Sequence, residues 1–245
     1  MSSLMEGKLA VVTGGSRGIG RAIAEAYIRE GARVVIPDIN LEVAEKTAAE
    51  LGADKCFAMK LNVADKENVL QAIDKIWNEI GPVDVWVNNA GISEDVPFEE
   101  VKEEKWDMIL QVDLKGVFLC SQAIFAKMKE RRCGKIINIA SMAGERGGRV
   151  SGAHYSAAKG GVLTLTKVLA LNGGEYGITA NAITPGLILT QMAKDLGWDK
   201  QEHKDIPLGR LGTAEDVANV ALFLGSYLSD YVNGDTIRAN GGMYM

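Results

Sequence analysis

Tyr155 and Lys159 stand four positions apart in the segment YSAAK, and Ser141 precedes Tyr155 by fourteen residues. Four-residue spacing on an α-helix puts both side chains on one face, where the phenol can meet the ammonium. A neighbouring ammonium favours the phenolate, lowers the pKa of the phenol and makes it a usable proton donor and acceptor. The pair therefore indicates chemistry on alcohols and ketones.

A glycine-rich turn near the start of the chain predicts a dinucleotide site. Residues 8–13 form an apolar stretch typical of a buried strand, and an amphipathic helix follows from about Gly18 to about Gly31. Between them, TGGSRGIG carries Gly14, Gly18 and Gly20 in the spacing G-x-x-x-G-x-G. Glycines let the backbone approach a pyrophosphate, and the start of the helix offers free N–H groups and a positive dipole end.

Five motifs occur in an order that resembles the short-chain dehydrogenase/reductase family, in its branch of single-domain enzymes of similar length. They are TGGSRGIG at 13–20, NNAG at 88–91, Ser141, YSAAK at 155–159, and NAITPG at 181–186 followed by Thr190. The motifs span nearly the whole chain, so the resemblance covers all of it. It implies a nicotinamide cofactor and a Rossmann-type fold.

The resemblance also implies a role for each matching residue. Ser141 would hold the substrate carbonyl or hydroxyl, Tyr155 would be the general acid and base, and Lys159 would also bind the nicotinamide ribose. NNAG would stabilise the central sheet beside the cofactor. The nicotinamide pocket would be lined by Pro185, Gly186, Ile188 and Thr190. The expected cofactor-binding residues are Gly14, Ser16, Arg17, Gly18, Ile19, Gly20, Asp38, Asn62, Val63, Asn89, Ala90, Gly91, Tyr155, Lys159, Pro185, Gly186, Ile188 and Thr190.

Asp38 favours NAD over NADP as the cofactor. It ends the second predicted strand, RVVIP, twenty-four residues after Gly14. Its carboxylate can accept hydrogen bonds from ribose hydroxyls and would repel a 2′-phosphate. The alternative is that Asp38 only caps the helix that begins near Asn40. Arg17 favours NADP, because a basic residue in this turn accompanies NADP in many relatives, but Ile39 and Asn40 supply no second basic residue.

Two residues depart from the family pattern. Asn62 replaces the Asp that relatives use near the adenine, and its amide can still bond the ring. Asp113, in QVDLKGVF, replaces an Asn that supports a helix kink and a water in the proton relay from Lys159. An ionised Asp113 would offset the positive field at Tyr155, whereas a protonated one would act like the amide. We expect Asp113 to belong to the relay, because its neighbours are apolar and argue against a surface position.

The loop AGERGGRVSGAH makes the separation of Ser141 and Tyr155 one residue longer than in many relatives. It carries Arg146, Arg149 and His154, which could bind a carboxylate, sulfonate or phosphate on the substrate. The alternative for each of them is a solvated loop charge.

Short apolar segments alternate with helical ones along the chain, a pattern that predicts one doubly wound parallel sheet of about seven strands with helices on both faces. The strands are expected near 8–13, 33–37, 55–61, 83–87, 135–140, 178–184 and 235–239. No repeat or linker divides the chain, so we expect a single domain over residues 1–245. The irregular segment of about 187–212 follows the nicotinamide motif and is expected to be a substrate lid, with an ordinary solvated connection as the alternative.

The composition agrees with a compact soluble enzyme. The chain has 245 residues, 47% of them hydrophobic, with a net charge of −5, a balance that argues against nucleic acid as a partner. The N-terminus lacks the pattern of a signal peptide and no run of apolar residues is long enough to cross a membrane, so we expect a cytoplasmic protein. Three cysteines and two histidines, without metal-ligand spacing, indicate neither a disulfide framework nor a metal site.

The sequence favours an NAD-dependent oxidoreductase that interconverts a secondary alcohol and a ketone on a small polar substrate, such as a polyol, sugar acid or hydroxy acid. A close alternative is an NADPH-dependent 3-oxoacyl-acyl-carrier-protein reductase. Arg132 could serve the acidic carrier, but Tyr176 stands where those reductases tend to present a second basic residue. A third reading is a sensor that binds NAD without turnover. Relatives are usually tetramers and the tail GGMYM is apolar, so a homotetramer is expected.

Overall fold

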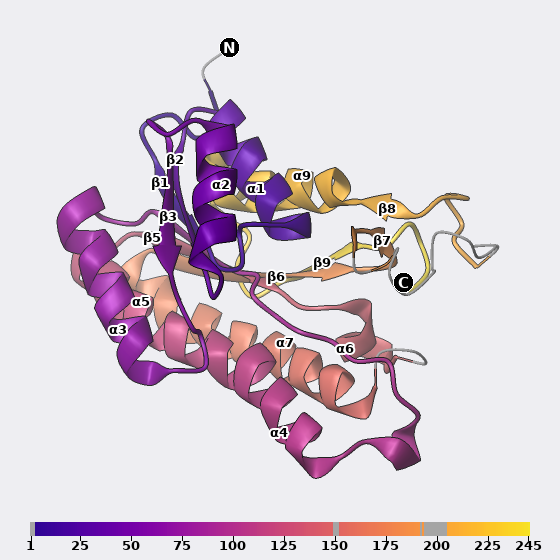
Figure 1. Ribbon diagram of the computed structural model, residues 1–245. Helices are drawn as coiled ribbons and strands as arrows, with labels where there is room; N and C mark the ends of the chain where they lie inside the picture. The colour runs from indigo at the N-terminus through magenta and orange to yellow at the C-terminus, as the bar shows by residue number, and fades with distance from the viewer. Residues whose placement is uncertain (1–2, 149–151, 192, 194–204) are drawn as a thin grey trace.

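The computed structural model describes residues 3–148, 152–191, 193 and 205–245. Its centre is a seven-stranded sheet in which every neighbouring pair runs parallel, in the order β3-β2-β1-β4-β5-β6-β9 (Figure 1). Both the doubly wound α/β fold and the strand positions predicted from the sequence are confirmed. The strands are β1 Leu9–Val12, β2 Arg33–Asp38, β3 Cys56–Lys60, β4 Val85–Asn88, β5 Gly134–Ile139, β6 Ile178–Pro185 and β9 Thr236–Ala239.

Successive residues of a strand pack into two separate hydrophobic cores, one on each face of the sheet. Ala10 and Val12 of β1 face the cluster under α1 (Gly18–Arg29), α2 (Leu41–Leu51) and α9 (Ala214–Gly225). Leu9 and Val11 face the opposite cluster, and all four side chains are buried. Because a parallel strand covered on both faces packs both sets of side chains into a core, β1 (LAVV) is an uninterrupted apolar run rather than an alternating one.

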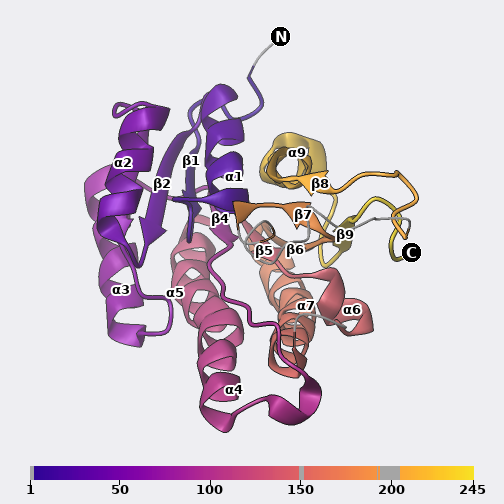
Figure 2. The same ribbon diagram turned by 45° about the vertical axis from the view of Figure 1, so that its right-hand side comes forward.

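The second core lies under α3 (Lys66–Lys75), α5 (Gly116–Arg131) and α7 (Ala153–Gly173), with Trp86 of β4 fully buried in it. Figure 2 shows these helices on the side of the sheet opposite to α1 and α9. Further helical turns are Ile76–Ile80 after α3, Phe98–Glu100 before α4, Gly174–Tyr176 after α7, and Tyr227–Ser229 after α9.

A single long helical stretch, Glu103–Arg131, combines α4 (Glu103–Leu110), a π-helical turn (Gln111–Lys115) and α5. It is long and apolar enough to cross a membrane by length and composition alone. The same property is common in core helices of soluble proteins, and α5 packs its apolar side against the sheet, with Ile124 and Met128 fully buried. The α5 part of the stretch is therefore a core helix in this fold, whereas residues 103–108 of α4 are exposed.

The carboxyl ends of the strands carry the short elements that frame the expected site. The helix α6 (Met142–Arg146) follows β5, and β7 (Ile188–Leu189) follows β6. A two-stranded parallel pair joins β7 to β8 (Gly212–Thr213), directly before α9. In open α/β sheets ligands bind at this edge, where the strand order reverses, which here lies between β1 and β4.

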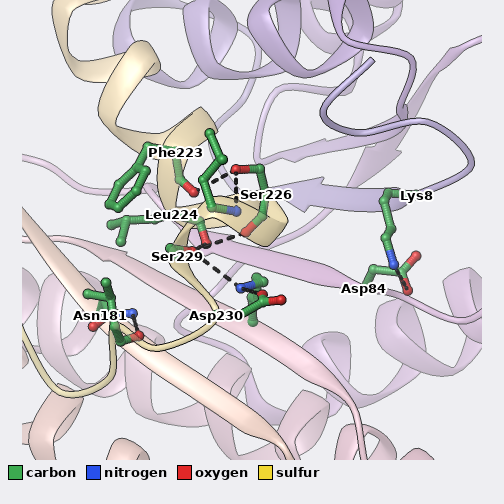
Figure 3. A network of polar contacts seen from close by, with 11 residues as sticks. Lys8, Asp84, Asn181, Phe223, Leu224, Ser226, Ser229 and Asp230 are labelled. Atoms are coloured by element: carbon green, nitrogen blue, oxygen red, sulfur yellow. Dashed lines mark hydrogen bonds and ion pairs between the residues drawn. The ribbon is translucent and has the colours of Figure 1, made fainter. Parts of the chain in front are cut away.

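The opposite edge of the sheet is closed by polar contacts after α9. Ser229 is fully buried and donates to the carbonyl oxygen of Leu224 at 2.8 Å, while Lys135 at the start of β5 contacts Asp230 at 2.8 Å (Figure 3). At the same edge, Lys8 lies 3.7 Å from Asp84, just before β1 and β4. These contacts tie the end of α9 to the sheet far from the carboxyl ends of the strands.

Candidate active site

The helix α7 carries both residues of the YSAAK pair, as the spacing predicted. The Lys159 side chain is 4% exposed, and its Nζ lies 5.5 Å from the centroid of the Tyr155 ring. Nζ also donates a hydrogen bond to the carbonyl oxygen of Ile139 at 3.1 Å, at the last residue of β5. The ammonium is thus fixed between the end of the central sheet and the phenol.

Asp113 is fully buried and pairs with Lys159. Its Oδ2 lies 3.2 Å from Nζ of Lys159, while Oδ1 accepts a hydrogen bond from the backbone N–H of Ile92 at 2.8 Å. The alternative of a carboxylate on the helix surface is therefore wrong. Whether Asp113 takes part in proton transfer stays a prediction.

A π-helical turn brings Asp113 to this position. The turn spans Gln111–Lys115 and interrupts the long helix between α4 and α5, at the place where the sequence predicted a kink. Such turns occur often at functional sites. Gly91 makes room for the pair, because a Cβ there would lie 2.8 Å from Oδ2 of Asp113 and 3.3 Å from Nζ of Lys159.

The two buried charges influence each other's protonation. Burial raises the pKa of Asp113, and the charge of Lys159 with the N–H of Ile92 opposes this rise. Burial disfavours the ammonium of Lys159, but the charges of Asp113 and of ionised Tyr155 together outweigh it, so that its pKa is raised. Lys159 is therefore a permanent cation beside Tyr155 at neutral pH.

Ser141 lies at the carboxyl end of β5, as the first residue before α6. Its Oγ accepts the backbone N–H of Ala143 at 3.1 Å, so it is also the N-cap of that helix. An ion pair between Glu145 and Arg238, at 2.6 Å, fastens α6 to β9. The helix that Ser141 caps also packs against α7, because a Cβ on Gly144 would lie 2.5 Å from the backbone carbon of Lys159.

The glycine turn after β1 has the features of a phosphate cradle. The helix α1 begins at Gly18 with no side-chain cap and no acidic residue in its first turn. By contrast α2, α3 and α9 are capped by Asn40, Asp65 and Thr213. The N–H groups and dipole of α1 are therefore available to an anion, which fits the pyrophosphate of a dinucleotide.

Asp38 ends β2 beside this turn and is 9% exposed. The hydroxyl of Ser16 donates to its Oδ2, and the backbone N–H of Asn40 donates to Oδ1 at 3.0 Å. Asn40 itself caps α2, by accepting the N–H of Val43 at 3.2 Å. The alternative in which Asp38 serves only as the helix cap is thus wrong, and its carboxylate lies where a ribose is expected.

Neighbouring strand ends bring other predicted cofactor residues together. Asn89 donates from Nδ2 to the carbonyl oxygens of Thr13 at 2.9 Å and Gly14 at 3.1 Å. A Cβ on Gly14 would lie 3.0 Å from Cα of Ala90, which shows how closely the turn after β1 meets the turn after β4. The remaining predicted cofactor residues lie on the same edge of the sheet: Ile19 and Gly20 in α1, Pro185 at the end of β6, Gly186 after it, and Ile188 in β7.

Four predicted residues line the outer parts of the same region. Thr190 is 3.8 Å from where a Cβ of Gly18 would be, so it meets the start of α1. Arg17 is exposed beside it. Asn62 and Val63 follow β3; Oδ1 of Asn62 accepts the N–H of Ala64 at 3.1 Å, and Val63 is 9% exposed.

The observation that decides the family is the match along the chain. The family model described as enoyl-(acyl carrier protein) reductase matches residues 14–244. The chain belongs to the short-chain dehydrogenase/reductase family. It is an oxidoreductase that acts on CH–OH groups.

Relatives in this family match the chain from end to end. A 3-oxoacyl-acyl-carrier-protein reductase of Escherichia coli is 41% identical over 242 residues, covering 98% of each chain. A sorbitol dehydrogenase of Cereibacter sphaeroides is 39% identical over 255 residues, covering 98% of this chain and 99% of the relative. The crystal structure of a 3-oxoacyl-acyl-carrier-protein reductase from Brucella melitensis superposes with a TM-score of 0.93 at 34% identity, over 99% of this chain and 93% of that one.

A buried polar network under the short-chain dehydrogenase/reductase site was not predicted beyond Asn88. Asn88 donates from Nδ2 to Oγ of Ser121 at 2.9 Å and to Oδ1 of Asn138 at 2.8 Å. Asn138 in turn donates to Oγ1 of Thr166 at 2.8 Å, which links β4 and β5 to α7. Only contacts between distant segments define such a network, so periodicity in the sequence gives no signal for it.

Further expectations concerned Arg146, Arg149 and His154 of the loop AGERGGRVSGAH, and the predicted lid. Arg146 is exposed at the end of α6, whereas His154 is fully buried at the start of α7 and is therefore not a solvated loop residue. Arg149 lies outside the described residues. Residues 192 and 194–204 of the predicted lid lie there too, whereas its two ends are described as β7 and β8. Within the described residues no group of three or more potential ligands could hold a metal ion.

Proposed function

We propose that this enzyme reduces the 3-oxo group of an acyl thioester carried by an acyl carrier, with NADH as reductant. The support for the reaction type is the arrangement of Tyr155, Lys159 and Ser141 at the carboxyl ends of the strands. The support for the substrate is the family's 3-oxoacyl-acyl-carrier-protein reductases, which are about as long as this chain. The sequence alone had placed such a reductase second, with NADPH as its cofactor, behind an NAD-dependent enzyme that acts on a small polar substrate.

A nicotinamide held at this edge of the sheet would supply the hydride, and the side chains of this chain handle the proton. Tyr155 donates its phenolic proton to the carbonyl oxygen as charge develops there. The ammonium of Lys159, held 5.5 Å from the ring centroid, stabilises the resulting phenolate. Ser141 orients the carbonyl through its hydroxyl. In the reverse direction the same phenolate accepts the proton of the alcohol.

NAD rather than NADP is proposed because of the carboxylate of Asp38. Its two oxygens are already acceptors for Ser16 and Asn40, and a carboxylate can accept further bonds from ribose hydroxyls. A 2′-phosphate at this place would bring a like charge against a carboxylate that is 9% exposed. The exposed Arg17 is the group that would have to offset that repulsion.

A dehydrogenase of small polyols is the second candidate, and the surroundings of Arg132 favour it. The guanidinium of Arg132 donates to the carbonyl oxygen of Glu175 at 2.6 Å and lies 5.6 Å from the centroid of the Tyr176 ring. Arg132, the cation that the sequence had suggested for an acidic carrier protein, is thus already bound by groups of this chain. The sorbitol dehydrogenase relative, almost as similar as the reductases, agrees with this candidate.

One panel of assays separates these candidates. The purified full chain is assayed with acetoacetyl thioesters of coenzyme A and of an acyl carrier protein, and with sorbitol and related polyols, each with NAD(H) and NADP(H). The proposal expects the highest kcat/KM with the carrier-bound thioester and NADH. A higher kcat/KM with a polyol selects the second candidate. Tight NAD binding without turnover of any substrate would instead indicate the sensor that the sequence left open.

We also propose that the enzyme is a homotetramer. Large apolar side chains stay exposed on α4, α5 and α7 of the single chain, a pattern typical of a covered face. These side chains are Trp106, Met108, Phe118, Val168 and Leu171. The C-terminal Met245 is 91% exposed as well. Light scattering at micromolar concentration should give about four times the chain mass, and a monomer would contradict the proposal.

A further inference from the structure

The helix α7 starts without the usual side chain at its N-cap. Gly152 occupies that position and can offer no side-chain acceptor to the unpaired N–H groups of the first turn. His154 takes over this role, because its Nδ1 accepts the backbone N–H of Tyr155 at 2.9 Å. The imidazole thus holds the very peptide that carries the phenol.

This hydrogen bond fixes the protonation state of the ring. A nitrogen that accepts a hydrogen bond carries no proton, so the neutral ring must bear its proton on Nε2. His154 is fully buried, and Nε2 makes no hydrogen bond with the described residues. Within the described part of the chain, Oε2 of Glu94 lies 3.6 Å from Nε2. The Nε2–H group is therefore a buried donor that faces a carboxylate.

Glu94 belongs to the loop between β4 and the turn Phe98–Glu100, and that loop also carries the contacts to the buried ion pair. Gly91 packs against Asp113 and Lys159, and Ile92 donates its N–H to Asp113. The imidazole of His154 therefore lies between two parts of the site. One part is the start of the helix that carries Tyr155, and the other is the loop that supports Asp113.

The backbone around His154 leaves space for the ring in this place. Gly152 has a φ of +62°, and a Cβ there would lie 2.7 Å from Nδ1 of His154 and 3.1 Å from the carbonyl oxygen of Glu94. Any other residue at this position would push the imidazole or the loop away. The glycine, the buried ring and the loop carboxylate thus form one fitted unit.

We propose that His154 is a positioning residue for Tyr155: its neutral imidazole accepts the N–H of Tyr155, fills the space between the start of α7 and the loop that carries Glu94, and so sets the phenol for proton transfer. The inference rests on the proposed role of Tyr155 as general acid and base. A protonated imidazole cannot act in this way, because Nδ1–H would face the N–H of Tyr155. Protonation of His154 should then break the hydrogen bond from the N–H of Tyr155.

The charged and titratable groups around the ring come from four elements. Glu94 faces Nε2 from the loop after β4, and Lys105 of α4 lies 3.8 Å from the other oxygen of Glu94. A charge on His154 would stabilise ionised Asp113 in the π-helical turn. Tyr155 and Lys159 follow on α7 itself. Nearby carboxylates favour the imidazolium form of His154, and nearby cations disfavour it. Removing the charge of Glu94 therefore tests the contact between Glu94 and His154.

The test uses three variants in the reducing direction, where Tyr155 must be protonated and does not itself cause a loss of rate on the acid side. His154→Asn keeps an acceptor near the place of Nδ1 and cannot be protonated. His154→Gln keeps a donor near the place of Nε2 and loses the acceptor. Glu94→Gln keeps an acceptor oxygen and removes the charge. For each, kcat, KM and the Kd for NADH are measured across pH under chemistry-limited conditions.

The inference expects a distinct result for each variant. His154→Gln should lose roughly tenfold to a hundredfold in kcat at all pH values, the scale of a misplaced catalytic group, with KM and the Kd for NADH within about twofold of wild type. His154→Asn should keep most of the kcat and lose the acid-side decline of the wild type. Glu94→Gln should move that decline to lower pH, because the carboxylate no longer favours imidazolium.

Several results would overturn the inference. These are a wild-type kcat in His154→Gln, an unchanged acid-side decline in His154→Asn, or equal losses in His154→Gln and His154→Asn. A Tyr155→Phe variant measured in parallel separates this failure from that of the proposed function. If Tyr155→Phe retains the wild-type kcat, the assignment of the general acid fails; if only the His154 variants behave like wild type, the positioning role alone fails.

Discussion

Oδ2 of Asp113 lies 3.2 Å from Nζ of Lys159, inside a site where neither side chain is more than 4% exposed. The other carboxylate oxygen accepts the N–H of Ile92. Burial raises the pKa of Asp113, and the ammonium and the N–H of Ile92 oppose that rise. Within the described residues only Oδ1 accepts a hydrogen bond, whereas Oδ2 faces the ammonium as an ion pair without one. This geometry favours ionised Asp113, whose negative charge offsets the field of Lys159 at Tyr155.

Asp113→Asn should therefore strengthen that field at Tyr155. The phenolate would form more easily, so the pH profile of kcat for alcohol oxidation should move to lower pH while the variant stays active. An unmoved profile would mean that Asp113 is neutral in the wild type. A loss of roughly a hundredfold in kcat, with NAD binding kept, would mean that the carboxyl itself carries the proton.

Tyr155→Phe removes the phenolic oxygen and keeps the ring. We expect kcat to fall by roughly a hundredfold or more, which is the scale of general acid and base contributions. The Kd for NAD, measured by fluorescence titration, should change little. Tyr176→Phe, at a tyrosine after α7 that contacts Lys129 rather than the site, is a matched control and should keep the wild-type rate. More than half of the wild-type kcat in Tyr155→Phe would disprove the assignment.

Asp38 predicts a preference for NAD over NADP in kcat/KM of at least about tenfold, equivalent to roughly 1.4 kcal/mol. Asp38→Ser should narrow this ratio, because the serine hydroxyl carries no charge against a 2′-phosphate. The measurement is kcat/KM with both cofactors at a fixed substrate concentration. Equal use of both cofactors by the wild type would contradict the prediction and would indicate that Arg17 binds the 2′-phosphate of NADP.

The three cysteines should differ in reactivity toward a disulfide reagent. Burial raises the pKa of the Cys56 thiol to about 11 and that of Cys120 to about 12, whereas Cys133 is exposed. In the native protein one thiol per chain should react quickly, and three should react after unfolding. Cys133→Ser should leave no fast thiol. If the native wild type shows none, another surface covers Cys133.

Asp216 should make stability depend on pH in the acidic range. Arg210 donates to both of its oxygens, at 2.7 and 3.0 Å, and holds the pKa of Asp216 below its usual value, helped by the N–H of Thr213. A lowered pKa in the folded state adds stability above the ordinary pKa of about 3.9, and this gain is lost as pH falls.

Asp216→Asn should therefore lower the free energy of unfolding at pH 7, because the amide loses the ion pair with Arg210 beside the capping box of Thr213. The difference from wild type should shrink below about pH 4. Urea unfolding at several pH values measures it. A pH-independent difference would show that the ion pair with Arg210 contributes nothing.

The sequence predicted the sheet well for a simple reason. Strands covered on both faces are rich in apolar residues, so β1 (LAVV) and the first three residues of β4 (VWV) stand out between polar turns. The YSAAK spacing likewise reports a local helical face, and the structure places Tyr155 and Lys159 as that spacing predicted. Local geometry encodes these features directly.

The supports of the site could not be predicted in the same way. The partners of Lys159 and Asp113 include the carbonyl oxygen of Ile139 and the N–H of Ile92, and a backbone group is present at every residue, whatever its side chain. His154 looked like a loop residue because the start of α7 carries a glycine at the N-cap instead of a polar residue. Only the fold reveals that the imidazole replaces the cap.

The pairing of β7 with β8 has a consequence for how this enzyme can change. Ile188 and Leu189 are hydrogen-bonded in register to Gly212 and Thr213, so both ends of the intervening segment are anchored to the body of the protein. With fixed ends, each doubling of a loop's length costs only about 0.6 kcal/mol in closure entropy. We therefore expect that substitutions between Leu189 and Gly212 leave Tyr155 and Lys159 in place on α7.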